Sequence, residues 1–176
     1  MRIRFLVLSS KIKFGIFISL FIPVILLDQW SKKWALGSLK GQHPTDYLGG
    51  LLKFIYAENR GAWGSIGSNL GENWHFVILI LLPSLALLAF AFYVFKTPKI
   101  SLYEFISYSF ILSGGFGNLI DRVLYGYVID FLYIGYGSIG TNIFNIADVA
   151  IMTGVIMLIL QYFQEKLAKK SVEKNA

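Results

Sequence analysis

The sequence predicts an integral membrane protein, mainly α-helical, with four transmembrane helices in a single membrane domain over residues 1–176. Hydrophobic residues make up 56% of the chain, and its mean hydropathy is +0.62. A chain of 176 residues with this composition is too apolar for a soluble domain and too short for two domains. Its basic residues also cluster beside long apolar runs, which is typical of membrane topology signals.

The first apolar run can be interpreted in two ways. Residues 14–27 follow a basic start and form a short apolar stretch, a pattern that is also typical of a cleavable signal peptide. The sequence from Leu26 to Trp30 lacks the small-residue cleavage pattern, however. We therefore expect the run to continue through Asp28 as a membrane span over about residues 14–34.

Three further runs reach the roughly 20 apolar residues that cross a bilayer core. They cover about residues 74–95, 101–120 and 143–162. Pro83 lies in the middle of the second span, where its ring and its missing N–H predict a structural kink.

Two segments connect these spans on the opposite side of the membrane from the termini, over about residues 35–73 and 121–142. The first is rich in glycine and contains a strand-like stretch at 51–57, followed by the turn-prone sequence Asn59-Arg60-Gly61. We expect a small sheet there, lying on the membrane surface.

Basic residues indicate the orientation. Four spans place both termini on one side, and ten of the sixteen Lys and Arg residues lie in the two terminal segments and the turn at Lys96–Lys99. The positive-inside rule predicts that this side is cytoplasmic. Because these residues flank apolar runs, the net charge of +6 does not indicate a nucleic-acid partner.

Three acidic residues in or beside apolar segments are the strongest functional signal: Asp121, Asp130 and Asp148. An ionised carboxylate inside a bilayer costs at least about 2.5 kcal/mol, so chains seldom keep several without a use. Asn118 and Asp121 are spaced i,i+3, as are Asn145 and Asp148, which puts each pair on one helical face. Spacing alone favours a common polar pocket in which Asp121 and Asp148 meet.

Structural roles compete with this interpretation. Asn145 and Asp148 suit a cap on the fourth span, because both residue types favour helix N-termini. Arg122 suits a structural pair with Asp121. Asp130, inside an apolar stretch, has neither explanation.

Helix packing is predicted by two further features. Asp28 and Lys32 have the i,i+4 spacing of an ion pair near the outer end of the first span, and this pair would also anchor the first outer loop beside the pocket. Close helix contact is typical of small residues in lipid, and the third span carries a patch of them: Ser113, Gly114, Gly115 and Gly117.

A pair of carboxylates held close together shares a proton and titrates as a coupled unit. One can then take a proton from water while the other protonates or polarises a carbonyl, as in aspartic proteases. Other hydrolytic designs lack a part, since the chain has no cysteine, His43 and His75 are isolated, and no GxSxG or HExxH string occurs. We expect no metal and no organic cofactor.

Two other functions stay open on residue types alone. A small proton-coupled transporter uses intramembrane acids as a relay, although relay acids should be distributed through the depth of the membrane. A lipid phosphotransferase would use the acids to hold Mg²⁺ and would lose activity in a chelator.

The strings GNLIDR, VIDF and FNIAD, with Asp28 and the Asn59-x-Gly61 loop, closely resemble the bacterial lipoprotein signal peptidase family, also called signal peptidase II. The likeness runs from about residue 28 to residue 151. It implies four transmembrane helices with a small outer-surface β-cradle and a short interfacial helix. It also implies an aspartic endopeptidase that removes the signal peptide from diacylglyceryl-modified prolipoproteins, just before the lipidated cysteine.

The resemblance assigns the catalytic pair to Asp130 and Asp148, in place of the Asp121 and Asp148 pair that spacing favours. Asn59 and Gly61 correspond to a loop that closes on the peptide. This chain departs from the family there, because it has one small residue fewer before the aromatic Trp63. Supporting or substrate-binding roles are implied for six more residues: Asn118, Asp121, Arg122, Asn145, Asp28 and Lys32.

The resemblance also implies partners and a location. The expected substrate is a lipid-modified prolipoprotein, and the expected surroundings are membrane lipids. We expect a monomer in the cytoplasmic (inner) membrane, with both termini cytoplasmic and the active site at the outer face.

Overall fold

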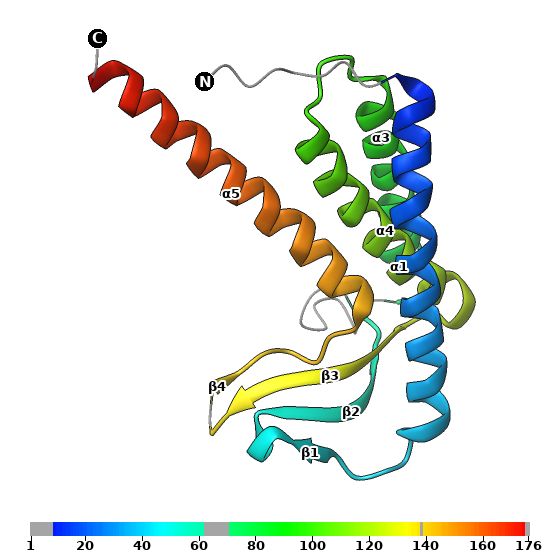
Figure 1. Cartoon of the computed structure of the whole chain (residues 1–176). Coiled ribbons are helices and arrows are strands. Elements are labelled where there is room, and N and C mark those ends of the chain that lie inside the picture. Colours follow the sequence, from blue (N-terminus) through cyan, green and yellow to red (C-terminus); the bar gives the residue numbers. More distant parts are fainter. Residues whose placement is uncertain (1–8, 62–70, 138, 175–176) are drawn as a thin grey trace.

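The computed structural model describes residues 9–61, 71–137 and 139–174. Long helices occupy one end of the molecule and a small sheet the other (Figure 1). The helices are α1 (Ser10–Ser38), α2 (Glu72–Phe76), α3 (Leu82–Lys96), α4 (Leu102–Tyr125) and α5 (Ile146–Lys174), and a π-helical turn, Val77–Leu81, joins α2 to α3.

Three of the described helical segments are long and apolar enough to cross a membrane: Ser10–Ser38, Trp74–Lys96 and Ile146–Ala168. Helix α4 is as long, with 24 residues, but polar side chains on its buried face lower its hydropathy. Its serines satisfy themselves within the helix, because Ser109 Oγ donates to Phe105 O at 2.7 Å and Ser113 Oγ donates to Ser109 O at 2.7 Å. This fourth helix is therefore suited to lie among the other three.

Local signals in the sequence account for the ends of α4. Ser101 and Glu104 form a reciprocal capping box, in which Glu104 N donates to Ser101 Oγ and Ser101 N donates to Glu104 Oε2. The helix ends at Gly126, which has a positive φ of 75° that glycine adopts readily. Because α4 extends to Tyr125, Asp121 and Arg122 lie within the helix and not in the segment after it.

Pro83 sits in the first turn of α3, just after the π-helical turn. In that turn Leu82 N donates to Val77 O, five residues back. The turn is therefore wider than a regular α-helical turn, and this avoids the clash between the proline ring and the preceding turn. The expected disturbance of the second span is present at this place and takes the form of a π-bulge.

The expected small sheet has four antiparallel strands in the order β1-β2-β3-β4. Their bounds are β1 Thr45–Tyr47, β2 Leu52–Asn59, β3 Val128–Tyr136 and β4 Ile139–Gly140. Near the start of strand β3, the side chains of Ile129 and Phe131 pack against Ala35 and Leu39 near the end of α1. This contact fixes the sheet to the helices. The short interfacial helix that the resemblance implies stays a prediction.

The small residues of α4 allow close helix contact, as expected. A Cβ added at Gly114 would collide with Ala147 O and Ile151, and one at Gly117 would collide with Asp28 and Ala147. Glycine is therefore required where α1, α4 and α5 meet. The start of α1, the end of α5 and the turn between α3 and α4 all lie at the end of the molecule opposite the sheet (Figure 1).

Candidate active site

The beginning of α5 is held by a reciprocal cap between Asn145 and Asp148. Asp148 N donates to Asn145 Oδ1 at 3.0 Å, and Asn145 N donates to Asp148 Oδ2 at 3.1 Å. The capping role expected as the structural alternative is thus present. It also fixes the Asp148 carboxylate, since Asn118 Nδ2 donates to its other oxygen, Oδ1, at 2.8 Å.

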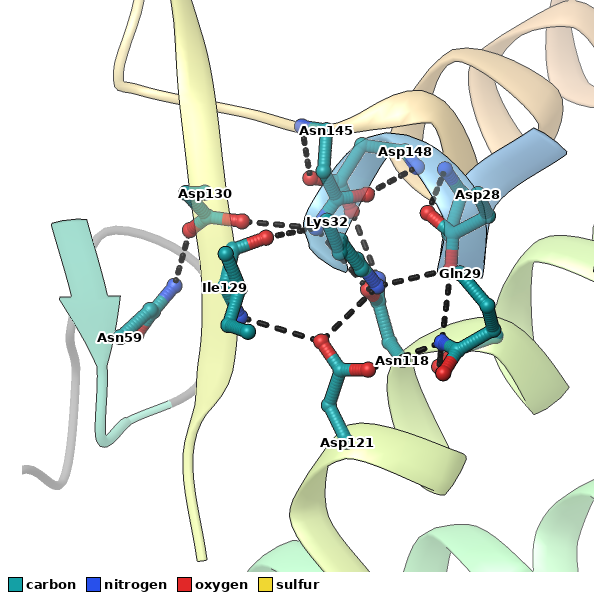
Figure 2. A network of polar contacts seen from close by, with 12 residues as sticks. Asp28, Gln29, Lys32, Asn59, Asn118, Asp121, Ile129, Asp130, Asn145 and Asp148 are labelled. Atoms are coloured by element: carbon teal, nitrogen blue, oxygen red, sulfur yellow. Dashed lines mark hydrogen bonds and ion pairs between the residues drawn. The ribbon is translucent and has the colours of Figure 1, made fainter. Parts of the chain in front are cut away.

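Asp130 reaches the same place from strand β3. Asn59 Nδ2 donates to Asp130 Oδ2 at 3.1 Å, and Asn145 Nδ2 donates to Asp130 Oδ1 at 2.7 Å. The pairing of β2 with β3 sets Asn59 opposite Val128 and Ala57 opposite Asp130, which aligns Asn59 for its bond. Asn145 therefore bonds to both Asp130 and Asp148 and brings the strand and the helix together (Figure 2).

Burial changes the acidity of Asp130, whose side chain is 3% exposed. Loss of hydration raises its pKa from 3.8 to about 7, and the negative charge of Asp148 contributes in the same direction. Hydrogen bonds from Asn59 and Asn145 oppose the shift but do not cancel it. Near neutral pH this carboxyl group can therefore hold or release a proton, as acid–base chemistry requires.

A second layer lies behind this pair and is centred on Lys32. Its Nζ lies 2.8 Å from Asp28 Oδ2 and 3.0 Å from Asp121 Oδ2. The predicted Asp28–Lys32 ion pair is confirmed, and Lys32 also donates to Asn118 Oδ1 at 3.0 Å. One buried cation thus neutralises two acids and orients the amide that contacts Asp148 (Figure 2).

The two acids of this layer also hold backbone groups. Asp28 Oδ1 accepts from Ala147 N at 2.9 Å, in the first turn of α5, and Asp121 Oδ2 accepts from Ile129 N at 3.0 Å. These bonds fix the residues immediately before Asp148 and Asp130 in the chain. The roles of Asp28 and Asp121 in the structure are therefore to place the elements that carry the other two acids.

This arrangement corrects the pairing that spacing alone favours. Asp121 is fully buried and its carboxylate is bonded to Lys32, Gln29 and Ile129. The direct ion-pair partner of Asp121 among the described residues is Lys32; Arg122 is adjacent to Asp121 and points to a different side of the helix.

Arg122 instead reaches the loop after β2. Its Nη2 donates to Gly61 O at 3.2 Å, and Gly61 N donates to Asn59 Oδ1 at 3.1 Å. His75 Nε2 lies 2.9 Å from Arg60 O on the same turn. The shortened stretch between Gly61 and Trp63 falls outside the described residues.

Asp130 and Asp148 both line a pocket of about 1220 Å³. Asn59, Asn118 and Arg122 also contribute to its polar part, together with Thr141, Asn142 and Thr153. The wall continues along α3 and α5 with apolar side chains: Pro83, Leu87, Phe90, Val149, Met152 and Ile156. The pocket thus joins a polar, acidic end to an apolar end, which suits a ligand with a peptide part and a lipid part.

Metal binding has no prepared site in the described part of the chain, where no three His, Cys, Asp or Glu side chains form a group suited to a metal ion. Two of the acids already have protein partners, since Asn118 donates to Asp148 and Lys32 pairs with Asp121. The acid–base interpretation requires no such group.

Two contributors to the site were missed in the sequence. Gln29 Nε2 donates to Asp121 Oδ1 at 2.8 Å and to Asp28 Oδ2 at 3.1 Å, and His75 holds the turn at Arg60. Gln29 follows Asp28 inside an apolar run, so a polar residue in a span was the available signal. His75 has no sequence signal, because its contact depends on where the loop folds.

The chain is similar to known proteins over most of its length. The family profile described as "Signal peptidase (SPase) II" matches residues 20–164. A protein of Clostridium novyi (strain NT) named lipoprotein signal peptidase is 37% identical over 142 residues, covering 80% of this chain and 93% of that protein. One of the same name from Streptococcus thermophilus (strain CNRZ 1066) is 38% identical over 145 residues, covering 82% and 90%.

A solved structure shares the fold as well. It is described as a bacterial membrane enzyme structure obtained by the in meso method at 2.3 Å resolution. It superposes with a TM-score of 0.75 at 27% sequence identity, covering 86% of this chain and 90% of that chain.

Proposed function

Because the chain belongs to the signal peptidase II family, we propose that Asp130 and Asp148 form its catalytic pair. The protein is a membrane aspartic peptidase that removes signal peptides from prolipoproteins. The main support for the residue assignment is that Asn145 hydrogen-bonds to both Asp130 and Asp148. Both acids also line one pocket.

The chemistry begins with a water molecule between the two carboxyl groups. Asp148 accepts bonds from Asn118 Nδ2 and from Asn145 N at the N-terminus of α5, a setting that stabilises a negative charge. Asp148 is thus suited to take the proton of the water. Asp130, with a pKa of about 7, is suited to protonate the oxygen of the scissile carbonyl.

Substrate binding follows from the two ends of the pocket. The polar end holds the peptide across the catalytic pair, and the apolar wall along α3 and α5 accommodates the acyl chains of a diacylglyceryl-modified cysteine. Cleavage just before that cysteine puts the scissile bond where the two ends meet. All of these residues come from one chain, so a monomer is sufficient.

The orientation of the protein determines on which side of the membrane cleavage occurs. The basic residues at the helix ends opposite the sheet support a cytoplasmic location for those ends by the positive-inside rule. The catalytic pair then lies at the outer face of the cytoplasmic membrane, where an exported prolipoprotein arrives. A proton relay would need acids through the depth of the bilayer, whereas Asp28, Asp121, Asp130 and Asp148 gather at one end.

Cleavage of a diacylglyceryl-modified prolipoprotein by the purified protein in detergent with EDTA tests the assignment. We expect wild type to cleave, and Asp130→Asn and Asp148→Asn each to lose at least about 10³-fold in kcat. Asp46→Asn is the matched control, since Asp46 is exposed on β1 and should leave kcat unchanged. Activity of either site variant within a few-fold of wild type contradicts the catalytic pair, and dependence on added Mg²⁺ contradicts the acid–base mechanism.

A further inference from the structure

Glu58, the residue before Asn59 on β2, points to the face of the sheet opposite Asp130. Side chains alternate along a strand, and the next side chain, that of Asn59, contacts Asp130 (Figure 2). Glu58 is paired with Ile129 of β3, paired residues point to the same face, and Ile129 packs against the end of α1. The Glu58 carboxylate therefore lies on the α1 side of the sheet.

Several donors converge on this carboxylate. Lys40 Nζ, just after α1, donates to Glu58 Oε1 at 2.8 Å, and Tyr56 OH donates to the same oxygen at 3.2 Å. Arg60 Nη2 lies 3.7 Å from the other oxygen, Oε2, and the Arg60 guanidinium lies 5.9 Å from the centre of the Tyr127 ring. Glu58 is thus connected to the end of α1, to its own strand and to the turn that follows β2.

These contacts keep Glu58 ionised. The hydrogen bond from Lys40 lowers the pKa of Glu58 from its ordinary value, and loss of hydration opposes this change. Hydrogen bonds from Tyr56 and Tyr127 lower the pKa of Glu58 as well. Glu58 is therefore a carboxylate near neutral pH, and its partners indicate that it holds the chain in place and does not transfer a proton.

Asn59 depends on this anchoring because it is the last residue of β2. Its Nδ2 donates to Asp130 Oδ2 at 3.1 Å, and its Oδ1 accepts from Gly61 N at 3.1 Å. The pairing of β2 with β3 ends at Asn59, so Glu58 is the neighbour that restrains it from the side of the strand. A carboxylate fixed on one face of the sheet thereby sets the direction of the amide on the other face.

We propose that Glu58 is a positioning residue of the peptidase, which holds the end of β2 so that the Asn59 amide is directed at Asp130. This role rests on the proposed catalytic function of Asp130. The hydrogen bond from Asn59 lowers the pKa of Asp130 against the effect of burial. Movement of Asn59 therefore changes the acidity of the catalytic carboxyl group.

Other charges act on Asp130 from the elements packed around it. They belong to Asp148 of α5, Lys32 of α1 and Arg122 of α4. Within the described part of the chain, the hydrogen bonds and ion pairs of these three residues do not include Glu58. A change at Glu58 therefore reaches Asp130 through the end of β2.

The titration of Asp130 tests this role without substrate. Protonation of Asp130 is followed against pH in the full-length protein in detergent, from the infrared difference between each protein and the same protein carrying Asp130→Asn. We expect Glu58→Ala to raise the pKa of Asp130 by at least about 0.5, because the Asn59 bond is weakened, whereas loss of the Glu58 charge alone would lower this pKa. Glu58→Gln should raise it by less, since its amide oxygen still accepts from Lys40 and Tyr56.

A double variant separates this path from other effects. If Glu58 acts through Asn59, adding Glu58→Ala to Asn59→Ala should change the pKa of Asp130 by less than about 0.2. Asp46→Ala is the matched control, because it removes an acid of the same sheet from its 3.4 Å contact with Lys53, and it should leave the pKa of Asp130 unchanged. An unchanged or lowered pKa in Glu58→Ala overturns the proposal, as does an equal rise in the presence and absence of Asn59.

Cleavage of a diacylglyceryl-modified prolipoprotein gives a second readout. Glu58→Ala should lower kcat about tenfold and leave KM within about twofold of the wild-type value, whereas Asp46→Ala should change neither. A raised KM with unchanged kcat contradicts a positioning role. Wild-type protein that fails to cleave contradicts the proposed function, and the pKa of Asp130 in Glu58→Ala then still decides whether Glu58 positions Asn59.

Discussion

Asn145 is the residue at which the site is assembled. Its backbone and side chain contact Asp148, and its amide nitrogen also donates to Asp130, Asn118 and Ile129 O. The hydrogen bonds of Asn145 therefore both cap helix α5 and align the two acids. A residue that local rules explain fully as a cap can thus also organise a catalytic pair.

The raised pKa of Asp130 predicts a pH-dependent stability. The folded state binds the Asp130 proton with a pKa of about 7, against 3.8 as the ordinary value. Between these pH values the folded state holds a proton that the unfolded state has lost, so stability falls as pH rises towards 7. Asp130→Asn removes this effect.

Thermal unfolding in detergent measures it. The Tm of Asp130→Asn minus that of wild type should be at least about 3 °C larger at about pH 8 than at about pH 4.5. Asp46→Asn, at an exposed site, should show no comparable change. A Tm difference independent of pH would show that Asp130 is not titrating between these values.

The burial of Lys32 between two acids predicts a larger effect on stability. Its side chain is 2% exposed, and Asp28 and Asp121 beside it are fully buried. Lys32→Met leaves two buried carboxylates without a cation and should destabilise the fold by about 3–5 kcal/mol. Tm in detergent checks this.

Two comparisons separate charge from shape at Lys32. Lys40→Met removes an exposed cation from its 2.8 Å contact with Glu58 and should cost less than about 1 kcal/mol. Adding Asp28→Asn and Asp121→Asn to Lys32→Met should recover part of the lost Tm, because no buried charge remains. If the triple variant is no more stable than Lys32→Met, loss of packing is the cause.

At the scale of elements, α4 is the structural centre because it combines small residues with polar ones. Gly114 and Gly117 bring α5 and α1 close, and Asn118 and Asp121, on the next turn, contact residues of both. The close packing makes these contacts short enough for hydrogen bonds. Hydropathy alone underestimates α4 as a span for the same reason, since its polar side chains face other helices.

Gly114→Ala tests this packing. The added Cβ meets Ala147 O and Ile151, so α5 must shift at the turn that carries Asp148. We expect a stability loss of about 1–3 kcal/mol and a fall in kcat measured on the same sample. Gly15→Ala in α1 is the control, since nothing lies within 4 Å of its added Cβ; there alanine should be neutral or stabilising. Equal behaviour of the two variants would contradict the role of Gly114.

At the scale of the whole molecule, the helices and the sheet supply different residues of the site. The helices carry Asp28, Lys32, Asn118 and Asp148 to one end of the bundle, and the sheet brings Asp130 and Asn59 to that end from outside. Strand β3 is connected to α1 by Ile129 and Phe131 and to α5 through Asn145. The site therefore forms only when both parts have assembled.

The orientation of this assembly can be measured in the cysteine-free background. Asp46→Cys on the sheet should react with a membrane-impermeant maleimide added to intact spheroplasts. Lys170→Cys near the end of α5 should react only after the membrane is opened. The positive-inside rule predicts this result from the basic residues at the helix ends. The reverse pattern would place the active site in the cytoplasm and contradict the proposed location.

Much of this architecture is encoded locally. Composition and apolar run lengths predict the membrane class and the helices, because a bilayer-spanning segment must be apolar over its own length. The Asp28–Lys32 pair and the cap of Asn145 with Asp148 were predictable for a similar reason: their partners are three or four residues apart on one helix. The motif resemblance supplied the choice of Asp130.

Tertiary structure alone decided how these local pieces combine. Spacing put Asp121 on a suitable helical face, but only the folded chain places Lys32 and Ile129 N against it and leaves Asp130 at the pocket. The partners of Gln29 and His75 lie on other elements, beyond any local rule. Sequence periodicity describes which side of an element a residue faces, whereas the contact it makes depends on the element packed there.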